Sequence, residues 1–235
     1  KLGGGYQPFR DEPRVQETKV IAFLLDNQTI CLRDFVANAS SNINHDCKVD
    51  WLELNHRGTL LLFRDKRRQL HLYDVARQQR STLLNYCTYV QWVPESDVVV
   101  AQNRSALSVW YNIHAPDQVT VHQIKGDVEE IWRGEGRTEV IVDEGIREAT
   151  YLLDEGLIQF GGALEDNDLK GAMEILEAIE LTPDAEAMWA KLGQAAHRAE
   201  AWAVAQRCAA ALGDVGRARY LHRMNKLARS EGEGA

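Results

Sequence analysis

Cysteine and proline are scarce in this sequence. Of its 235 residues, four are Cys and five are Pro. The four cysteines include no C-x-x-C pair, which excludes the ligand spacing of common zinc sites and a dense disulfide framework. They stand far apart, at Cys31, Cys47, Cys87 and Cys208. This usage is typical of buried thiols in a reducing compartment.

Long apolar runs and an excess of positive charge are also missing. The longest apolar run, Val20 to Leu25, is far shorter than the roughly 18 residues of a membrane-spanning helix, so we expect no span. The net charge of -8 argues against a broad nucleic-acid surface, because phosphate binding depends on Lys and Arg. The first residue is Lys1 and no signal-peptide layout follows, so we expect a sequence that begins inside a longer chain.

Catalytic motifs are absent as well. There is no G-x-S-x-G elbow, no H-E-x-x-H and no P-loop, and the seven His are isolated in sequence. One segment, from Asp166 to Glu177, has the spacing of a calcium loop, but Lys170 would stand at its fifth ligand position. The same acids suit a helix N-cap and first turn. We expect no enzyme activity, no metal and no cofactor.

Composition changes abruptly near Phe160. Val, Ile and Thr together number 33 in residues 1–160 and 5 in residues 161–235, whereas Ala rises from 8 to 18. β-Branched residues favour strands and Ala favours helices, which predicts a β part followed by an α part. Gly161 and Gly162 would absorb the turn between them. We expect an irregular segment at 1–17, a β domain at 18–160, helices at 161–229 and a flexible tail at 230–235.

The β part contains an internal repeat. Four short apolar runs each end in a turn with a carboxylate or amide, spaced 39, 38 and 40 residues apart, at Asp26, Asp65, Asn103 and Asp143. A strand with a Trp precedes three of these runs, at Trp51, Trp92 and Trp132. Four strands per roughly 40 residues is the period of a WD40-like β-propeller, although no Gly-His or Trp-Asp dipeptide marks the blades. We expect about four blades of a larger propeller, three of them complete. The alternative, a meandering β-sandwich, does not require the recurrence.

The α part has apolar residues at helical spacing over 168–180, 183–198, 200–212 and 215–229. Trp189, Leu192 and Gly193, with Ala205 sixteen residues after the Trp, fit the tetratricopeptide (TPR) pattern. In that pattern the Gly lets two helices approach and the Ala lies at their crossing. Other positions of the pattern are not matched, so a generic α-solenoid hairpin remains the alternative.

Two sets of residues are candidates for partner binding. The first is a basic cluster on a turn between strands, Arg64, Lys66, Arg67 and Arg68, which suits an acidic partner, a phospholipid head group or an import receptor. The alternative for this cluster is an ordinary solvated turn. The second set is the aromatic side chains of the helices, Trp189, Trp202 and Tyr220, for which core packing is the favoured interpretation over a peptide groove.

Several segments resemble the family of intraflagellar transport protein 172, from about Thr18 to Lys226. The most specific are 49–55, 62–66, 70–74, 89–94, 97–104, 109–113, 124–128, 153–158 and 182–189. The resemblance implies the end of a second propeller and the start of a TPR-like solenoid. It also implies a non-enzymatic scaffold of ciliary transport trains.

The partners implied by this resemblance are other subunits of the transport B complex and, through the solenoid, the A complex. The implied locations are the cilium or flagellum, the ciliary base and the cytoplasm. The alternative function is a vesicle-coat or nuclear-pore scaffold, because these proteins use the same order of propeller and solenoid. A substrate adaptor is a third possibility, but the separate adaptor motif that it requires is not evident.

Overall fold

The computed structural model describes residues 19–232, and for Asp184 and residues 228–232 it describes the backbone alone. The chain divides into two compact units. The first contains the described residues up to Lys66 together with 72–81, and the second contains 67–71 and the residues from Thr82 onward.

The first unit consists of antiparallel strands and contains the first sheet and most of the second, whose residues 70–71 and 82–84 belong to the second unit. One sheet has the order β1-β2-β3, with bounds Val20–Leu24, Thr29–Asp34 and Ala39–Asn44. The next sheet has the order β4-β5-β6-β7, with bounds Val49–Leu54, Leu60–Asp65, Leu70–Asp74 and Gln79–Leu84. A cluster that includes Ile30, Leu61 and Phe63 forms the core of this unit. In β5 consecutive residues are apolar and buried, so both faces of this strand are covered.

Two further sheets belong to the second unit. One has the order β11-β10-β9-β8, where β8 is Cys87–Trp92, β9 Val99–Asn103, β10 Ala106–Trp110 and β11 Thr120–Gln123. The other has the order β12-β13-β14, with bounds Asp127–Gly134, Arg137–Asp143 and Glu148–Leu153. Gln102 connects the two sheets: its amide nitrogen donates to the Gly126 carbonyl at 2.9 Å, and its amide oxygen accepts from the Val128 N–H at 2.9 Å.

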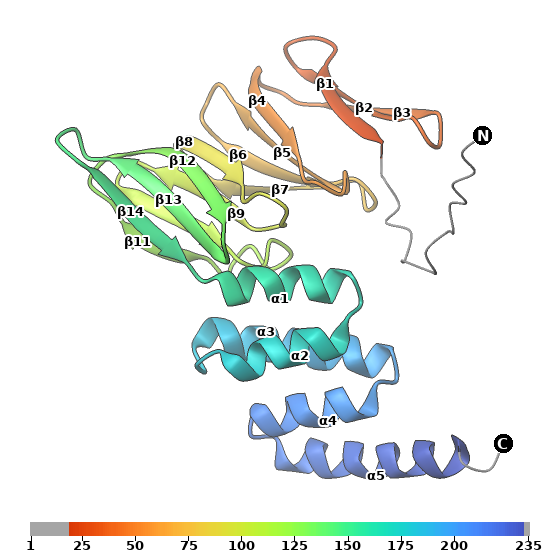
Figure 1. Ribbon diagram of the computed structural model, residues 1–235. Helices are drawn as coiled ribbons and strands as arrows, with labels where there is room; N and C mark the ends of the chain where they lie inside the picture. Colours follow the sequence, from red (N-terminus) through yellow and green to blue (C-terminus); the bar gives the residue numbers. More distant parts are fainter. Residues whose placement is uncertain (1–18, 233–235) are drawn as a thin grey trace, which may run out of the picture. The chain divides into compact units, whose positions relative to one another are not determined.

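The predicted repeat is confirmed in the strands. Asp65, Asn103 and Asp143 end β5, β9 and β13, the second strand of each sheet. Asp26 lies in the turn after β1, where its carboxylate accepts from the backbone N–H of Gln28 at 2.7 Å. The four antiparallel sheets are propeller blades (Figure 1). Within the described residues two of them have four strands and two have three, so complete blades are fewer than the three expected.

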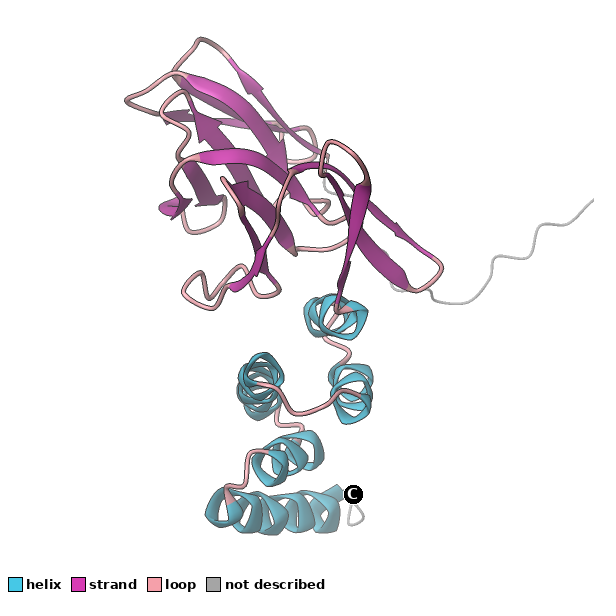
Figure 2. Cartoon of the chain, turned by 90° about the vertical axis from the view of Figure 1, so that its left-hand side faces the viewer, coloured by secondary structure: helices cyan, strands magenta, loops and turns pink. Residues whose placement is uncertain are grey.

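Five helices follow the strands, as Figure 2 shows in cyan. They are α1 (Glu155–Glu165), α2 (Leu169–Ala178), α3 (Pro183–Arg198), α4 (Trp202–Ala211) and α5 (Val215–Gly232). Each helix packs against the next, so they form successive antiparallel hairpins. Three N-caps match the sequence chemistry, with side chains of Asp154, Asp168 and Thr182 accepting from the backbone at the starts of α1, α2 and α3. Asp168 is therefore the N-cap of α2, which is one of the two roles that its position in the sequence allowed; the other was a ligand in a calcium loop.

The first helix begins earlier than the composition change suggested. Its first residue is Glu155, because Asp154 caps it, and Gly161 and Gly162 lie inside the helix and not in a turn. The order of strands before helices is confirmed, since β14 ends at Leu153. The segment expected at 1–17 lies outside the described residues, and residues 230–232 of the expected tail continue α5. In the described part of the chain, no helix is long and apolar enough to cross a bilayer.

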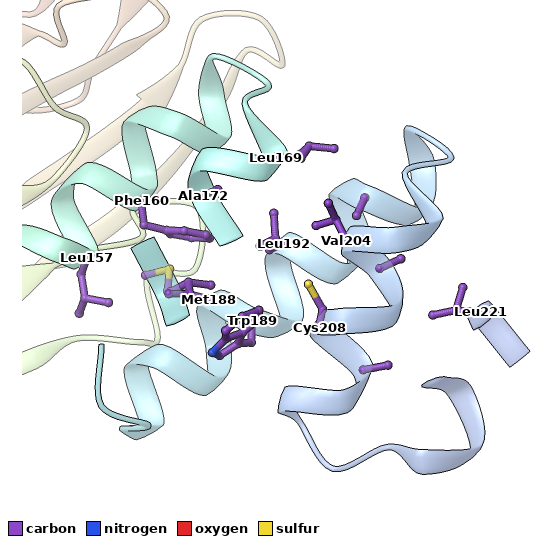
Figure 3. Close-up of a cluster of buried hydrophobic side chains, with 14 residues drawn as sticks. Leu157, Phe160, Leu169, Ala172, Met188, Trp189, Leu192, Val204, Cys208 and Leu221 are labelled. Atoms are coloured by element: carbon purple, nitrogen blue, oxygen red, sulfur yellow. The ribbon is translucent and has the colours of Figure 1, made fainter. Parts of the chain in front are cut away.

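The helical core lies between the hairpins (Figure 3). Trp189 and Ala205, the predicted crossing pair, are each 3% exposed and belong to one cluster. A Cβ at Gly193 would lie 3.2 Å from the Cβ of Cys208, which is tighter than ordinary contact. A side chain at this position would require Cys208 to shift by a few tenths of an ångström, because α3 and α4 approach each other closely here.

Candidate interaction surfaces and the junction between blade and helices

A polar cluster joins the last blade to the first helix. Arg133 on β12 donates to Glu155, the first residue of α1, with 2.7 Å between Nη2 and Oε1. Its other terminal nitrogen donates to the carbonyls of Pro94 at 2.8 Å and Glu95 at 3.2 Å, in the loop after β8. Thr138 on β13 donates to the second carboxylate oxygen of Glu155 at 2.5 Å. We call Arg133, Thr138 and Glu155 the junction cluster.

Two more hydrogen bonds support this junction. The backbone N–H of Asp154 donates to the hydroxyl of Tyr111 at 2.9 Å, which connects the helix cap to the segment after β10. Lys191 on α3 donates to the side-chain oxygen of Asn112 at 3.0 Å. The first and third helices are therefore both attached to the blade formed by β8–β11.

Electrostatics favour this arrangement. Burial opposes ionisation of Glu155, but hydrogen bonds from Arg133 and Thr138 outweigh it and lower the pKa of the carboxyl below its usual 4.5. Desolvation lowers the pKa of Lys191 from its usual 10.5, against the attraction of Glu165 and Asp97. A half-buried, charge-assisted pair with several donors is stronger and more directional than an exposed ion pair.

The chemistry of the junction cluster is structural. Both carboxylate oxygens of Glu155 accept hydrogen bonds from the protein, and the guanidinium of Arg133 is shared between that carboxylate and two carbonyls. No group of this cluster is poised to exchange a proton with a substrate. What the geometry does is fix the direction in which the helices leave the blade.

The four basic residues predicted to bind a partner differ in their exposure. Arg64 lies on β5, half-buried, and its Nε donates to the carboxylate of Asp50 on β4 at 2.9 Å. Lys66, Arg67 and Arg68 are exposed in the turn before β6, and Arg68 has a positive φ of 60°. One of the three points in the sequence where the chain passes from one unit to the other falls between Lys66 and Arg67.

The three aromatic candidates also differ. Trp189 is buried, as expected for a core residue. Trp202 is half-buried with its ring 5.5 Å from that of His197, edge to face. The core assignment is wrong for Tyr220, which is 58% exposed on α5. Only one apolar side chain of that part of the helix, Leu221, is buried, because no further helix covers α5 in the described residues.

A buried polar network in the first unit was not expected from the sequence. His45, in the loop before β4, contacts Asp65 with 3.2 Å between Nε2 and Oδ2, and Arg80 donates to its Nδ1 at 2.8 Å. Because Nδ1 accepts from Arg80, Nε2 carries the proton and donates to Asp65. Both ring nitrogens are thus used within the protein and offer no lone pair to a metal. The signal available in sequence was the recurrent aspartate at the end of the second strand.

The buried thiol of Cys208 is similarly unreactive. Burial raises its pKa to about 11 from the usual 9.0. The thiolate is the nucleophilic form, so this cysteine is a packing residue between α3 and α4. Its neighbours in the helical core include Leu192 and Ala205.

Comparison with curated proteins finds close relatives. The chain is 54% identical over 215 residues to "Intraflagellar transport protein 172" of Chlamydomonas reinhardtii, covering 90% of this chain and 12% of that protein. It is 49% identical over 220 residues to the Danio rerio homologue and 46% identical over 220 residues to "Intraflagellar transport protein osm-1" of Caenorhabditis elegans. The chain spans about an eighth of the length of these relatives.

Other comparisons find less. No family model matches the chain. Among solved structures, it is similar to a chain of the mitotic checkpoint complex, with a TM-score of 0.42, 17% identity and coverage of 59% of this chain and 45% of the other. It is also similar to U3-55K, with a TM-score of 0.39, 11% identity and coverage of 56% and 48%.

Proposed function

Since the chain belongs to the family of intraflagellar transport protein 172, we propose that it forms part of a non-enzymatic scaffold subunit of the intraflagellar transport B complex. In this role it works in the cilium or flagellum and at the ciliary base. Other B-complex subunits are its partners, and the helices that follow the blades contribute to contact with the A complex.

The observation that supports a scaffold best is the junction cluster. A scaffold positions its partners relative to one another, so its domains must be joined at a defined angle. Arg133 lies on β12 and bonds to the loop after β8 and to α1, so it connects three elements at a single point. Tyr111 and Lys191 add two bonds to the same joint.

The basic turn is the proposed partner contact within this scaffold. Lys66, Arg67 and Arg68 are exposed and suit an acidic surface, whereas Arg64 is engaged with Asp50 and supports the sheet. Reversal of Lys66 and Arg68 to Glu should weaken one subunit contact without unfolding the protein. Arg77→Glu, at another exposed turn residue, is the matched control.

Co-purification tests the function directly. The full-length protein, tagged and purified from isolated cilia, is expected to bring down transport B subunits in constant proportion. Vesicle coats and nuclear pores use the same order of propeller and solenoid. Recovery of coat or pore subunits, with no enrichment in cilia, would refute the proposed function in favour of that alternative.

A further inference from the structure

Positive charge is concentrated in the turns at one end of the strands of the second unit. These turns contain five Lys or Arg and one Glu, and they lie at 67–69, 85–86, 104–105, 124–126 and 144–147. The turns at the other end contain four Asp or Glu and no Lys or Arg, and they lie at 93–98, 111–119 and 135–136. The helices follow from this acidic end, because α1 begins after β14. The basic turns are therefore at the end opposite the helices.

Hydrogen bonds and strand pairing hold three of the basic turns together. The backbone N–H of Cys87 donates to the carbonyl of Arg68 at 2.8 Å, and Cys87 pairs with Asn103 across β8 and β9. Tyr86 and Arg104 adjoin this pair in sequence, and the guanidinium of Arg104 lies 5.2 Å from the centre of the Tyr86 ring. Tyr86 is therefore next to both of the turns that carry an arginine.

The side chains of these turns are open to solvent. Arg68 and Arg104 are exposed, and Tyr86 is 60% exposed. Each of the three turns joins two strands that the structure describes, so this exposure does not come from an unpaired strand. By contrast, Arg147 at the same end is paired with Glu144, with 2.8 Å between Nε and Oε2. We call Arg68, Tyr86 and Arg104 the arginine–tyrosine patch.

The chemistry of this patch suits carboxylates. A guanidinium is planar and can donate two parallel hydrogen bonds to one carboxylate. Because the Arg104 guanidinium is already held against the Tyr86 ring, it loses less freedom when it binds a ligand. The exposed ring adds contact area at low entropic cost.

The charges around the patch favour a narrow ligand over a wide anionic surface. A membrane or a nucleic acid would also meet the acids of a chain whose net charge is -8, including Asp127 and Glu144 in or next to the basic turns. A short protein segment meets the patch alone, because charge interactions are screened over about 8 Å at physiological salt.

We propose that the arginine–tyrosine patch binds a segment of a partner subunit that is rich in Glu and Asp. Carboxylates of the segment pair with Arg68 and Arg104, and its chain packs on the ring of Tyr86. The inference rests on the proposed scaffold function, and it adds two residues and the chemistry of the partner to the contact proposed at Lys66 to Arg68. Complementary charge of this kind selects the partner.

A peptide titration on the full-length protein tests the patch. The probe is a labelled peptide of about 12 residues in which Glu alternates with Ser, which spans about 40 Å when extended. We expect saturable binding that weakens as salt is raised. The double variant Arg68→Glu, Arg104→Glu should lose at least about tenfold in affinity, whereas Arg198→Glu, the same charge change at the exposed end of α3, should bind like the original.

These substitutions suit the backbone of the turns. Arg68 and Arg104 have φ of 60° and 53°, and Glu95 and Glu135 of this chain adopt similar values, so Glu fits both positions. Tyr86, with φ of 57°, is replaced by Asn, which adopts positive φ more readily than most residues. Tyr86→Asn removes the ring, so it should weaken peptide binding while the pattern of limited proteolysis stays unchanged.

Two further measurements separate this contact from other occupants of the patch. A peptide with Gln in place of Glu should bind at least about tenfold more weakly. Vesicles of equal parts phosphatidylserine and phosphatidylcholine should show no binding that depends on Arg68 and Arg104. In the purified assembly, a photoreactive phenylalanine analogue at position 86 should crosslink to a segment of another subunit that is rich in Glu and Asp.

Four results would overturn the proposal. They are no binding of the acidic peptide, equal loss in Arg198→Glu and in the double variant, vesicle binding that the double variant abolishes, and a crosslink from position 86 to the same polypeptide. None of these affects co-purification from cilia, so failure of the patch and failure of the scaffold function are distinguishable.

Discussion

At the scale of the residue, Trp189 contributes most to the helical core. Its ring is 3% exposed among Leu192, Ala205 and Cys208. Trp189→Ala should lower the free energy of unfolding of the helical part by about 3–5 kcal/mol, through lost burial and the cavity left behind. Hydrogen exchange should show the loss of protection over residues 183–212, since neighbouring hairpins stabilise each other.

A surface role for Trp189 would give another pattern. Protection over residues 183–212 would then be unchanged in the variant while partner binding was lost. Tyr220→Ala is the matched control, because this aromatic is exposed and its removal should change the unfolding free energy by less than about 0.5 kcal/mol.

Glu155 makes the junction sensitive to pH. Its pKa is lower in the folded protein than its ordinary 4.5, so its stabilising effect is present above that value and is lost as the pH falls through the folded pKa. Glu155→Gln should cost about 1–3 kcal/mol at neutral pH, because the Arg133 guanidinium is left half-buried without its anion.

Chemical denaturation at several pH values measures this effect. The stability difference between Glu155→Gln and the original chain should shrink as the pH falls below 4.5 and through the lower pKa of the folded protein, where the original carboxyl becomes protonated. A difference that stays constant with pH would show that the carboxylate charge has no part in the junction. Glu148→Gln, an exposed acid on β14, is the control and should show no such difference.

At the scale of the element, two helical glycines have opposite roles. A Cβ at Gly161 would meet no described atom within 4 Å outside its own stretch of α1, whereas one at Gly193 would lie 3.2 Å from the Cβ of Cys208. Ala is favoured over Gly inside a helix by about 1 kcal/mol. Gly161→Ala should therefore stabilise the protein by up to that amount, and Gly193→Ala should lose the gain or destabilise.

Urea denaturation of the two single variants decides this point. A higher midpoint for Gly161→Ala and an equal or lower one for Gly193→Ala are expected, with the slope unchanged. Equal stabilisation by both substitutions would show that α3 and α4 do not need a glycine where they approach each other.

Elements with a local signal could be predicted from sequence. The repeated Asp26, Asp65, Asn103 and Asp143 predicted where the strands end. At Asp26 and Asp143 the carboxylate accepts hydrogen bonds from backbone N–H groups of the turn. The start of α1 was missed because Gly161 and Gly162 suggested a turn, although Asp154 is an N-cap. The glycine pair is tolerated inside the helix, since tertiary packing of Leu157 and Phe160 outweighs their weak helix propensity.

The candidate site was not predictable in the same way. Arg133 and Glu155 are 22 residues apart and lie on different elements, so their pairing follows from how the helix packs on the blade. Tyr220 is the opposite case, because the burial that its spacing predicted does not occur. Its helical spacing suggested burial, but burial depends on a covering element that residue spacing does not report.

At the scale of the whole molecule, charge is unevenly distributed. The chain is acidic overall, with 35 Asp and Glu against 27 Lys and Arg, yet α5 carries only positive charge before Ser230. A net negative charge limits self-association, and basic segments such as α5 and the turn at Lys66 to Arg68 are places where an acidic partner is favoured. This distribution suits an assembly subunit better than a protein that acts alone.

We expect the last blade and the helices to form one rigid joint, fixed by Arg133, Thr138 and Glu155. Spin labels at Ile146→Cys, on the exposed turn between β13 and β14, and at Glu186→Cys, on α3, report the distance across this joint. The half-buried Cys47 is replaced by Ser, and mass spectrometry verifies that the buried cysteines stay unlabelled.

Pulsed electron resonance measures the distance between these two labels and therefore tests whether the joint is rigid. A rigid joint gives a single narrow distance distribution at neutral pH, which broadens in Glu155→Gln and in the original chain at acid pH. A distribution that is already broad in the original chain at neutral pH, or one that Glu155→Gln leaves unchanged, would contradict it.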